Sequence, residues 1–247
     1  MIPFHFEEGE VLLINKPLTW TSFDVINRFR FFLRKQLGIQ KIKVGHAGTL
    51  DPLADGLLIV CTGRFTKRID EFQGQEKEYT GTFRLGATTP SFDLEHEIDQ
   101  EYETAHITEA MIMEAALQFT GDIMQVPPQF SAIKVDGKRA YKSARKEKEV
   151  KLDARPVNIR EFEITRVALP DVDFRISCSK GTYIRSLVRD FGEALNSGAH
   201  LTALRRNRIG EFELADAHEL DALMAELTSL SEMEKDFSEE GDSGKLE

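Results

Sequence analysis

The hydrophobic positions along the chain follow two different periods, which predict strands in some segments and helices in others. Residues Leu57–Cys61 form an unbroken apolar run, and such a run predicts a strand that is covered on both faces. The segment KEYTGTFRLG, residues 77–86, alternates polar with apolar side chains, as a half-exposed strand does. Two more strands are predicted over residues 157–168 and 172–179. The sequence therefore predicts a sheet that contains both fully buried and half-exposed strands.

Helical periodicity alternates with these strands. Apolar residues recur at helical spacing from Phe23 to Leu37, and the pattern stops at Gly38. Either Thr21 or Ser22 can cap the start of this helix. Because strands and helices follow one another in a mixed order with short connections, we predict an α+β fold with a mixed, largely antiparallel central sheet flanked by helices and loops. Further helices are predicted over residues 65–72, 108–119, 138–150, 182–195 and 217–227.

The ordered part of the chain is expected to form one domain over residues 1–230. A length of 247 residues, of which 41% are hydrophobic, is sufficient for one large core with an appendage. From Ser231 onward the sequence is polar and acidic, so we expect a disordered tail over residues 231–247. We expect the roughly 30 residues after His218 to be too few for another folded domain.

The composition favours a cytoplasmic protein. No apolar run approaches the length of a membrane span, and the first ten residues lack the basic flank and apolar core of a signal peptide. Cys61 and Cys178 are isolated inside strand-like runs, which indicates buried free thiols rather than a disulfide framework. The sequence contains no CxxC, HExxH or similar spacing, so we expect no metal and no other cofactor.

Charge is distributed unevenly along the chain. The net charge is −10, but residues 211–247 contain 13 acidic and 2 basic residues, so the first 210 residues are close to neutral. Within that part, Lys and Arg are concentrated in residues 28–68, 134–160 and 180–208. Such segregation is typical of a protein with one side that faces a polyanion, which indicates a nucleic-acid partner. The alternative is that these segments are ordinary solvated faces.

The segment VGHAGTLDPLADG, residues 44–56, places a carboxylate at the start of the buried strand. Pro52 fixes its own backbone and keeps Asp51 out of helical geometry, so we expect Asp51 on a stiff, extended turn. Gly45 and Gly48 allow another part of the backbone to come close. Taken alone, the bend favours the simpler interpretation of a structural Asp-Pro turn that closes a hairpin.

Two further side chains suit chemistry on an RNA base. An enzyme that modifies a base within folded RNA must extrude it, and an aromatic platform in a basic cleft stabilises the extruded base. Tyr79 is a candidate for that platform. Arg185 is a candidate for the cation that keeps a partly buried carboxylate ionised. The simpler alternatives are that Tyr79 packs in the core and that Arg185 lies on the surface of a helix.

The segment GHAGTLDPLADGLLIVCTGRFTK, residues 45–67, closely resembles the active-site motif of the TruB family, the bacterial tRNA pseudouridine synthases that modify uridine 55 in the T loop. Similar segments follow in family order over about residues 10–220. This signal is highly specific, because a series of ordered matches is implausible by chance. The other matching segments are LLINKPLTWTS, KEYTGTFRLG, VPPQFSAIKVDGKRAYKSARKEKEV, CSKGTYIRSLVRDFGEAL and GAHLTALRRNRIGEF.

The resemblance implies a role for each of five site residues. Asp51 matches the catalytic aspartate of the family. Tyr79 matches the tyrosine that stacks on the uracil, and Arg185 matches the arginine that pairs with the aspartate. His46 matches the histidine that packs against T-loop nucleotides, and Leu204 matches an apolar residue that lines the pocket.

The resemblance also implies how the RNA is held. Residues 124–155 resemble a mobile, thumb-like insertion that closes over the RNA, and the lysine and proline of LLINKPLTWTS match a motif that helps to build the wall of the site. The resemblance therefore leads us to expect contacts with the RNA backbone from Lys16, Lys134, Lys138 and Arg145.

The implied activity is the isomerisation of uridine 55 of tRNA to pseudouridine. The N-glycosidic bond is cleaved, the base rotates, and the base is attached again through carbon, with Asp51 as the catalytic carboxylate. The expected partner is the T stem-loop of tRNA, and we expect a monomer that binds neither a membrane nor a metal. The alternative is a non-catalytic module that binds or refolds tRNA. A nucleosidase is disfavoured, because glycoside hydrolysis usually needs two carboxylic acids.

Three features depart from the family pattern. Thr19 stands where the first motif usually has a glycine, so we expect a differently shaped turn there. Pro90 stands where an acid is expected, although Asp93 is kept, which puts an RNA contact from that loop in doubt. Many relatives carry a small RNA-binding domain after the catalytic one. We expect no such domain here and predict that the catalytic domain alone recognises the T arm.

Overall fold

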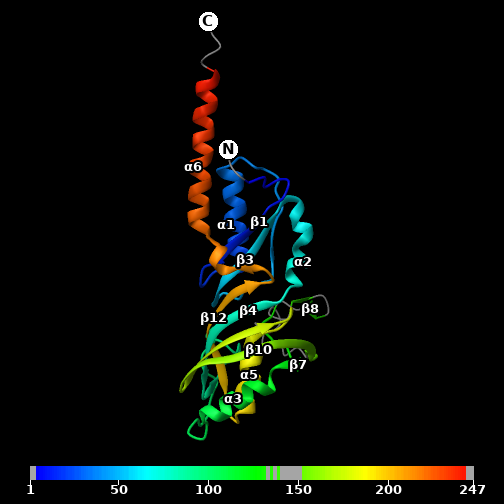
Figure 1. The fold of residues 1–247 in the computed structure, drawn as a ribbon, viewed down its shortest axis with the longest axis vertical. Coiled ribbons are helices and arrows are strands. Elements are labelled where there is room, and N and C mark those ends of the chain that lie inside the picture. The colour runs from blue at the N-terminus through cyan, green and yellow to red at the C-terminus, as the bar shows by residue number, and fades with distance from the viewer. Residues whose placement is uncertain (1–3, 132–133, 136–137, 140–151, 243–247) are drawn as a thin grey trace. The chain divides into compact units, whose positions relative to one another are not determined.

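The computed structural model describes residues 4–131, 134–135, 138–139 and 152–242. The chain divides into two compact units (Figure 1). Unit 1 consists of Met1–Gly74 together with Asn207–Glu247, and unit 2 consists of Gln75–Arg206. The first and the last described segments of the chain therefore belong to the same unit.

Unit 1 is built around strand β3, Ala54–Thr62. Strand β1, Val11–Lys16, pairs antiparallel with β3, and so does strand β2, Val44–Ala47. The short strand β14, His218–Glu219, pairs parallel with β1, which makes the strand arrangement mixed. The other elements of unit 1 are α1 (Ser22–Lys35), η1 (Gly63–Arg68), α2 (Ile69–Gln73), β13 (Phe212–Glu213), η2 (Leu214–Asp216) and α6 (Leu220–Asp242).

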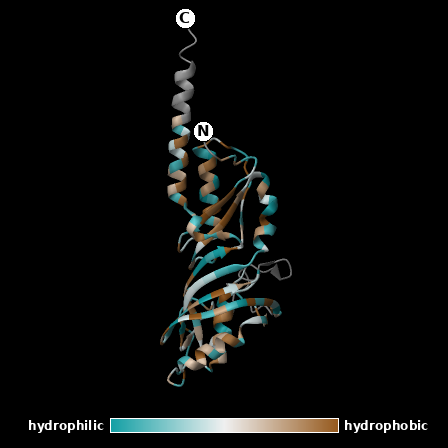
Figure 2. Ribbon diagram, viewed as in Figure 1, coloured by the Kyte–Doolittle hydropathy of each residue, from teal (hydrophilic) through white to brown (hydrophobic). Residues whose placement is uncertain are grey.

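The core of unit 1 lies on both faces of β3, as the unbroken apolar run predicts. Leu58 and Val60 pack in one cluster with residues of α1 and α6. Leu57 and Ile59 pack in a second cluster that includes Phe72 of α2. Figure 2 shows the corresponding concentration of hydrophobic colour on these central strands. Because β3 is enclosed on both faces, it is a rigid base for the loop that precedes it.

Helix α1 begins with a capping box. The Thr21 hydroxyl accepts from the Asp24 N–H, and the Asp24 carboxylate accepts from the Thr21 N–H, so Thr21 rather than Ser22 is the cap. The expectation that Phe23 lies on the buried face is wrong, because this side chain is 60% exposed and Val25 is buried instead. Ile26, Phe29, Phe32 and Leu33 of the predicted apolar face are buried, whereas Leu37 lies beyond the end of α1 and is half-buried.

Helix α6 lies beside α1 in unit 1 (Figure 1), and the carboxylate of Asp221 pairs with Arg28 across the two helices. Leu220, Leu223, Met224 and Leu227 bury its apolar stripe. The helix continues through Asp242, so residues 231–242, for which we expected disorder, are helical in the structure. Residues 243–247 lie outside the described residues.

Unit 2 contains a sheet with the strand order β12–β4–β11–β10–β7. The pairs β4–β11, β11–β10 and β10–β7 are antiparallel. This arrangement, together with unit 1, confirms the α+β fold with a mixed, largely antiparallel sheet. The elements of unit 2 are β4 (Lys77–Leu85), β5 (Ala87–Thr88), β6 (Gln100–Glu101), α3 (Glu109–Gln118), β7 (Gly121–Gln125), β8 (Lys134–Val135), β9 (Lys138–Arg139), β10 (Arg155–Ala168), β11 (Asp171–Cys178), α5 (Ile184–Ala194) and β12 (Ala199–Ile209), of which residues 207–209 belong to unit 1.

Helix α5 covers one face of this sheet through an aromatic core. The ring of Phe191 on α5 lies 5.0 Å from that of Phe83 on β4 and 5.4 Å from that of Phe162 on β10. Phe174 on β11 contacts both of the latter rings. These aromatic contacts fix α5, and hence the side chains that it carries, against the sheet.

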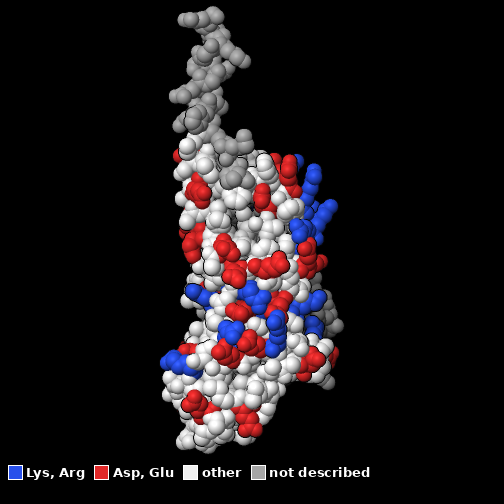
Figure 3. Space-filling view, in the orientation of Figure 1, with Lys and Arg blue, Asp and Glu red and all other residues white. Residues whose placement is uncertain are grey.

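The alternate residues of the same strands form a charged face. Arg175 of β11 pairs with three carboxylates, and Arg166 and Arg84 each pair with one aspartate at 2.6 and 2.9 Å. Acidic and basic side chains are likewise interleaved on the face shown in Figure 3. The carboxylates around Arg175 are Glu78, Glu161 and Glu163, at 3.6, 2.9 and 2.7 Å.

The structure describes residues 124–155, which we expect to form a thumb-like segment, only in part. Lys134 and Val135 of β8 pair with Arg139 and Lys138 of β9 in a short antiparallel hairpin. Lys138 is therefore in a strand and does not begin the helix that we predicted there. Arg145 and the rest of that predicted helix lie outside the described residues, except for Arg139.

Both cysteines are buried free thiols, as predicted. Burial raises the pKa of each thiol to about 11, so neither is a ready nucleophile at neutral pH. Within the part of the chain that the structure describes, no helix combines the length and the apolar character needed to cross a membrane.

Candidate active site

Asp51 lies in the loop that connects β2 with β3 in unit 1. Its carbonyl oxygen accepts from the N–H of Ala54 at 3.1 Å, which closes a tight turn over Pro52. Asp51 is half-buried and lies just before the start of the buried strand β3, as the sequence predicts. His46 is also half-buried and lies on β2, where it pairs with Val60 of β3.

The residues on both sides of Asp51 are held by residues 19–22, at the start of α1. The Ser22 hydroxyl accepts from the Leu50 N–H at 2.8 Å and lies 3.2 Å from the Leu50 carbonyl oxygen, to which it donates. The N–H of Thr19 donates to the Pro52 carbonyl oxygen at 2.8 Å. The backbone is therefore fixed immediately before and immediately after the carboxylate.

Lys16 stabilises the loop between β1 and α1 from its buried side. It is fully buried at the end of β1, and its ammonium group donates to the carbonyl oxygens of Pro17 and Trp20 at 2.9 and 2.6 Å. This burial places Lys16 inside the wall of the loop, as the first motif implies. It also removes Lys16 from the residues that we expect to contact the RNA backbone.

Thr19 adopts the left-handed backbone conformation, with φ of 71°. A β-branched residue is rarely found there, whereas glycine adopts it freely. Thr19 thus takes the conformation that glycine favours, although we expected the threonine to change the shape of the turn. The strain indicates that the surrounding contacts determine this turn.

In unit 2, Tyr79 lies on β4 opposite Ile176 of β11 and is buried. Leu204 lies on β12, which neighbours β4 in the sheet, and is half-buried. Lys77 lies two residues before Tyr79 on the same face of β4 and is also buried. Burial lowers the pKa of Lys77 to about 8.

Arg185 lies on α5 and is only 4% exposed, so it is not the surface residue of the simpler alternative. Its guanidinium group donates to the carbonyl oxygens of Ser91 and Phe130 at 3.1 and 3.0 Å. The same group lies 3.5 Å from the carboxylate of Asp93, which is buried too. Arg185 thereby ties the loop around Asp93 to the start of the thumb-like segment.

The expected site residues are thus divided between the two units. Unit 1 carries Lys16, His46 and Asp51, whereas unit 2 carries Tyr79, Arg185 and Leu204. Lys134 and Lys138 lie in the β8–β9 hairpin of unit 2, and Arg145 lies outside the described residues. Across the described ranges, no group of three or more His, Cys, Asp or Glu residues is arranged to hold a metal ion.

A family model described as "TruB family pseudouridylate synthase (N terminal domain)" matches residues 34–184. The chain belongs to the TruB family. A second model, described as "tRNA pseudouridylate synthase B C-terminal domain", matches residues 185–239 of this TruB chain. The second match covers residues that we assigned to the catalytic domain.

Several curated proteins resemble this TruB chain over most of their own length. A protein of Flavobacterium johnsoniae named tRNA pseudouridine synthase B is 58% identical over 218 residues, which cover 88% of this chain and 95% of the relative. A protein of the same name from Parabacteroides distasonis is 60% identical over 209 residues, which cover 85% of this chain and 89% of the relative.

A solved structure of an H/ACA RNP bound to a substrate RNA containing 2′-deoxyuridine includes a chain with a similar fold. The TM-score is 0.64 at 26% identity, and the match covers 89% of this chain. The TruB chain spans only 53% of that solved chain. The two proteins thus share a fold over about half of the larger one.

Sequence reasoning missed four residues that lie close to expected site residues of their own unit, Thr19 and Ser22 in unit 1 and Lys77 and Asp93 in unit 2. Ser22 was considered only as a helix cap, and Thr19 only as a departure from the motif. Lys77 has no signal beyond its place in the KEY segment, and Asp93 was noted without its partner Arg185. Each of them is defined by contacts between distant segments, which a single sequence does not show.

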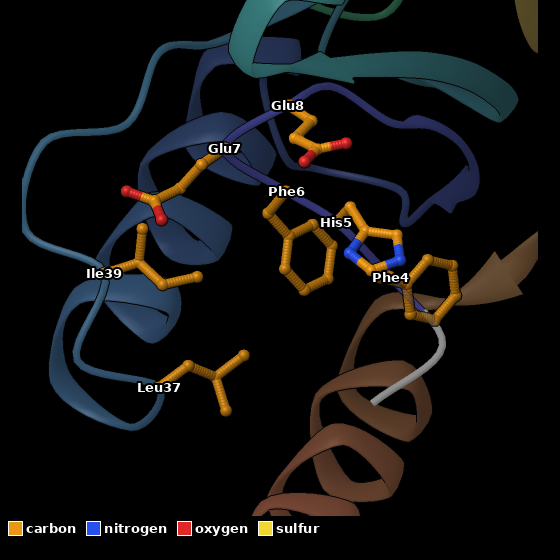
Figure 4. A pocket seen from close by; sticks show the side chains of 7 residues that line it. All are labelled: Phe4, His5, Phe6, Glu7, Glu8, Leu37 and Ile39. Atoms are coloured by element: carbon orange, nitrogen blue, oxygen red, sulfur yellow. The ribbon is translucent and has the colours of Figure 1, made fainter. Parts of the chain in front are cut away.

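Unit 1 also has a surface hollow of about 270 Å³ at the N-terminal segment (Figure 4). It is lined by Phe4, His5, Phe6, Glu7, Glu8, Leu37 and Ile39. None of the expected site residues lines this hollow.

Proposed function

We propose that this protein converts uridine 55 in the T loop of tRNA to pseudouridine, with Asp51 as the catalytic carboxylate. The observation that carries the proposal is the 58% identity over 95% of a relative named tRNA pseudouridine synthase B. At this level of similarity the segment around Asp51 is expected to perform the same chemistry. The position in tRNA comes from the family resemblance of residues 45–67.

The reaction is an isomerisation, so it needs neither oxidant nor reductant. The bond between N1 of the uracil and C1′ of the ribose breaks, and a bond between C5 and C1′ forms after the base rotates. C5 loses a proton, N1 gains one, and the mass of the RNA is unchanged. A single carboxylate can serve by adding to the base, by adding to the sugar, or by removing a proton from the sugar. The half-buried, backbone-fixed position of Asp51 suits each of these roles.

The remaining site residues receive the roles that the resemblance implies. Tyr79 stacks on the flipped uracil, Leu204 lines the pocket, and Arg185 keeps the catalytic carboxylate ionised. His46 packs against T-loop nucleotides, and the thumb-like segment closes over the RNA. Phosphate contacts are expected from Lys134, Lys138 and Arg145, and such contacts dominate the affinity for RNA. We propose a monomer that acts in the cytoplasm, where its tRNA substrate is found.

The test is pseudouridine formation on an unmodified tRNA transcript labelled with tritium at C5 of uridine. The wild-type protein is expected to release tritium and to leave pseudouridine at position 55 alone. Asp51→Asn keeps the size of the side chain but removes its charge, so it should bind the tRNA and release no tritium. Asp70→Asn, on the exposed surface of α2, is the matched control and should react like the wild type.

Two results would contradict the proposal. If the wild-type protein binds tRNA but forms no pseudouridine, the alternative of a non-catalytic tRNA-binding or refolding module is favoured. Release of free uracil would instead indicate a nucleosidase. If pseudouridine forms at another position, the activity stands but the assignment to the T loop is wrong.

A further inference from the structure

The contacts around Asp51 come in a pair. Ser22 holds Leu50, the residue before Asp51, and Thr19 holds Pro52, the residue after it. Both contacts come from one short segment, residues 19–22, at the start of α1. We refer to these two contacts together as the Asp51 clamp.

The Ser22 hydroxyl is available for the clamp because it has no capping role. Thr21 caps α1 through its own hydroxyl, while Ser22 is the first helical residue and is 1% exposed. The single Ser22 hydroxyl satisfies both the N–H and the carbonyl group of Leu50. Leu50 is itself buried, so neither backbone group would find water if the hydroxyl were removed. Ser22 thus makes the hydrogen bonds to the Leu50 backbone that a neighbouring strand would make in a sheet.

The Thr19 side of the clamp is fixed by the surrounding loop. Lys16 binds the carbonyl oxygens of Pro17 and Trp20, which lie on either side of the turn that contains Thr19. Thr19 stays in the left-handed conformation in spite of its β-branched side chain. The Thr19 N–H therefore points toward the Pro52 carbonyl oxygen because of the surrounding contacts, and not because threonine favours this backbone conformation.

We propose that Ser22 is a positioning residue for the reaction: through Leu50 it fixes the backbone that carries Asp51, without touching the substrate. The inference rests on the proposed function, in which Asp51 is the catalytic carboxylate. A carboxylate that attacks or removes a proton must lie within a fraction of an ångström of its productive position, and misplacement by about 1 Å costs on the order of 100-fold in rate. Loss of the Ser22 hydroxyl should therefore act on the chemical step and leave tRNA binding unchanged.

The experiment compares Ser22→Ala with Thr62→Val. Thr62 is a fully buried residue at the far end of β3, where its hydroxyl accepts from the N–H of Glu10 at 3.0 Å. Both variants remove a buried hydroxyl from unit 1, but only Ser22 lies next to the Asp51 loop. Single-turnover rate constants are measured with enzyme in excess, the Kd for tRNA by filter binding, and the folded fraction from thermal unfolding.

We expect Ser22→Ala to lower the single-turnover rate constant by about 10- to 100-fold per folded molecule, with the Kd for tRNA essentially unchanged. Thr62→Val should lower Tm but leave the rate constant per folded molecule at the wild-type value. If Ser22→Ala does not fold, Ser22→Cys replaces it, because a thiol is a weaker hydrogen-bonding group of similar size. Its rate constant should be reduced as well.

A wild-type rate constant in the folded Ser22 variant would overturn the inference, as would an equal loss of rate in Thr62→Val. Asp51→Asn in the same series separates this failure from that of the proposed function. If Asp51→Asn is inactive while the Ser22 variant is fully active, only the positioning role of Ser22 is wrong. If Asp51→Asn keeps the wild-type rate, the proposed function itself fails.

Discussion

Replacing Lys77 with methionine tests by how much a buried positive charge in unit 2 lowers the free energy of unfolding. Lys77 begins β4 opposite Cys178 and is only 6% exposed, and its ammonium group donates to the Gln75 carbonyl oxygen at 2.5 Å. Burial is the main reason why the pKa of Lys77 falls from its ordinary value of 10.5 to about 8. The charges of Arg206 and Lys180 lower this pKa further, while Cys178 acts in the opposite direction.

The sign of the pH dependence follows from the lowered pKa. Between pH 8 and 10.5 the unfolded chain keeps the proton of Lys77 and the folded protein has lost it, so stability rises with pH across this window. Since one pKa unit corresponds to about 1.4 kcal/mol, the charged amine destabilises the fold by roughly 3 kcal/mol below pH 8. About 2 kcal/mol of this penalty is relieved between pH 7 and 9.5.

The assay is urea unfolding of the wild type and of Lys77→Met at pH 7 and at pH 9.5. Methionine has a similar length and no charge, so the variant should lack this contribution to the pH dependence. We expect the difference in unfolding free energy between the two proteins to move in favour of the wild type by about 2 kcal/mol as the pH rises. The matched control is Lys35→Met at the exposed end of α1. A difference that stays constant between the two pH values would refute the reasoning.

Three further predictions follow from the structure and the proposed function. Thr19→Gly removes the strain of a left-handed threonine and should raise the stability by roughly 0.5–1 kcal/mol, or about 1–4 °C in Tm, in thermal unfolding. Arg185→Lys leaves a single ammonium group where a guanidinium contacts two carbonyl groups and the buried Asp93, so urea unfolding should show a loss of about 3 kcal/mol. A T-stem-loop minihelix should be modified at a rate comparable to that of full-length tRNA, as measured by tritium release.

Each of these predictions has a contradicting outcome. A lower Tm for Thr19→Gly would show that the threonine side chain contributes more than its backbone strain removes. Wild-type stability of Arg185→Lys would show that the buried contacts of the guanidinium are dispensable. Turnover of the minihelix far below that of full-length tRNA would contradict recognition of the T arm alone.

The parts of the fold that the sequence predicts well are those set by local pattern. The run Leu57–Cys61 has no polar interruption, so its burial on both faces follows directly, and β3 confirms it. Helix α1 follows equally from periodicity. The exposure of Phe23 could not be predicted in this way, because the spacing alone does not show exactly which side of the first helical turn faces the core.

The site is less predictable, because its geometry depends on segments far apart in the chain. Ser22 and Leu50 are 28 residues apart, and nothing in either segment shows that they form hydrogen bonds. Arg185 and Asp93 are farther apart still, and the sequence left both a buried and an exposed arginine open. Lys16 shows the same limit, since a lysine is usually exposed, whereas here its ammonium group is buried and donates to the carbonyl oxygens of Pro17 and Trp20.

The charged face of the unit 2 sheet has a consequence for how RNA is attracted. Arg84, Arg166 and Arg175 count as basic residues in the sequence, yet each already pairs with one or more carboxylates on a neighbouring strand. A phosphate that approaches these arginines meets ion pairs and would have to displace an aspartate or a glutamate. Binding of tRNA should therefore release fewer counterions than the number of arginines and lysines suggests, and these three arginines should contribute little to its dependence on salt.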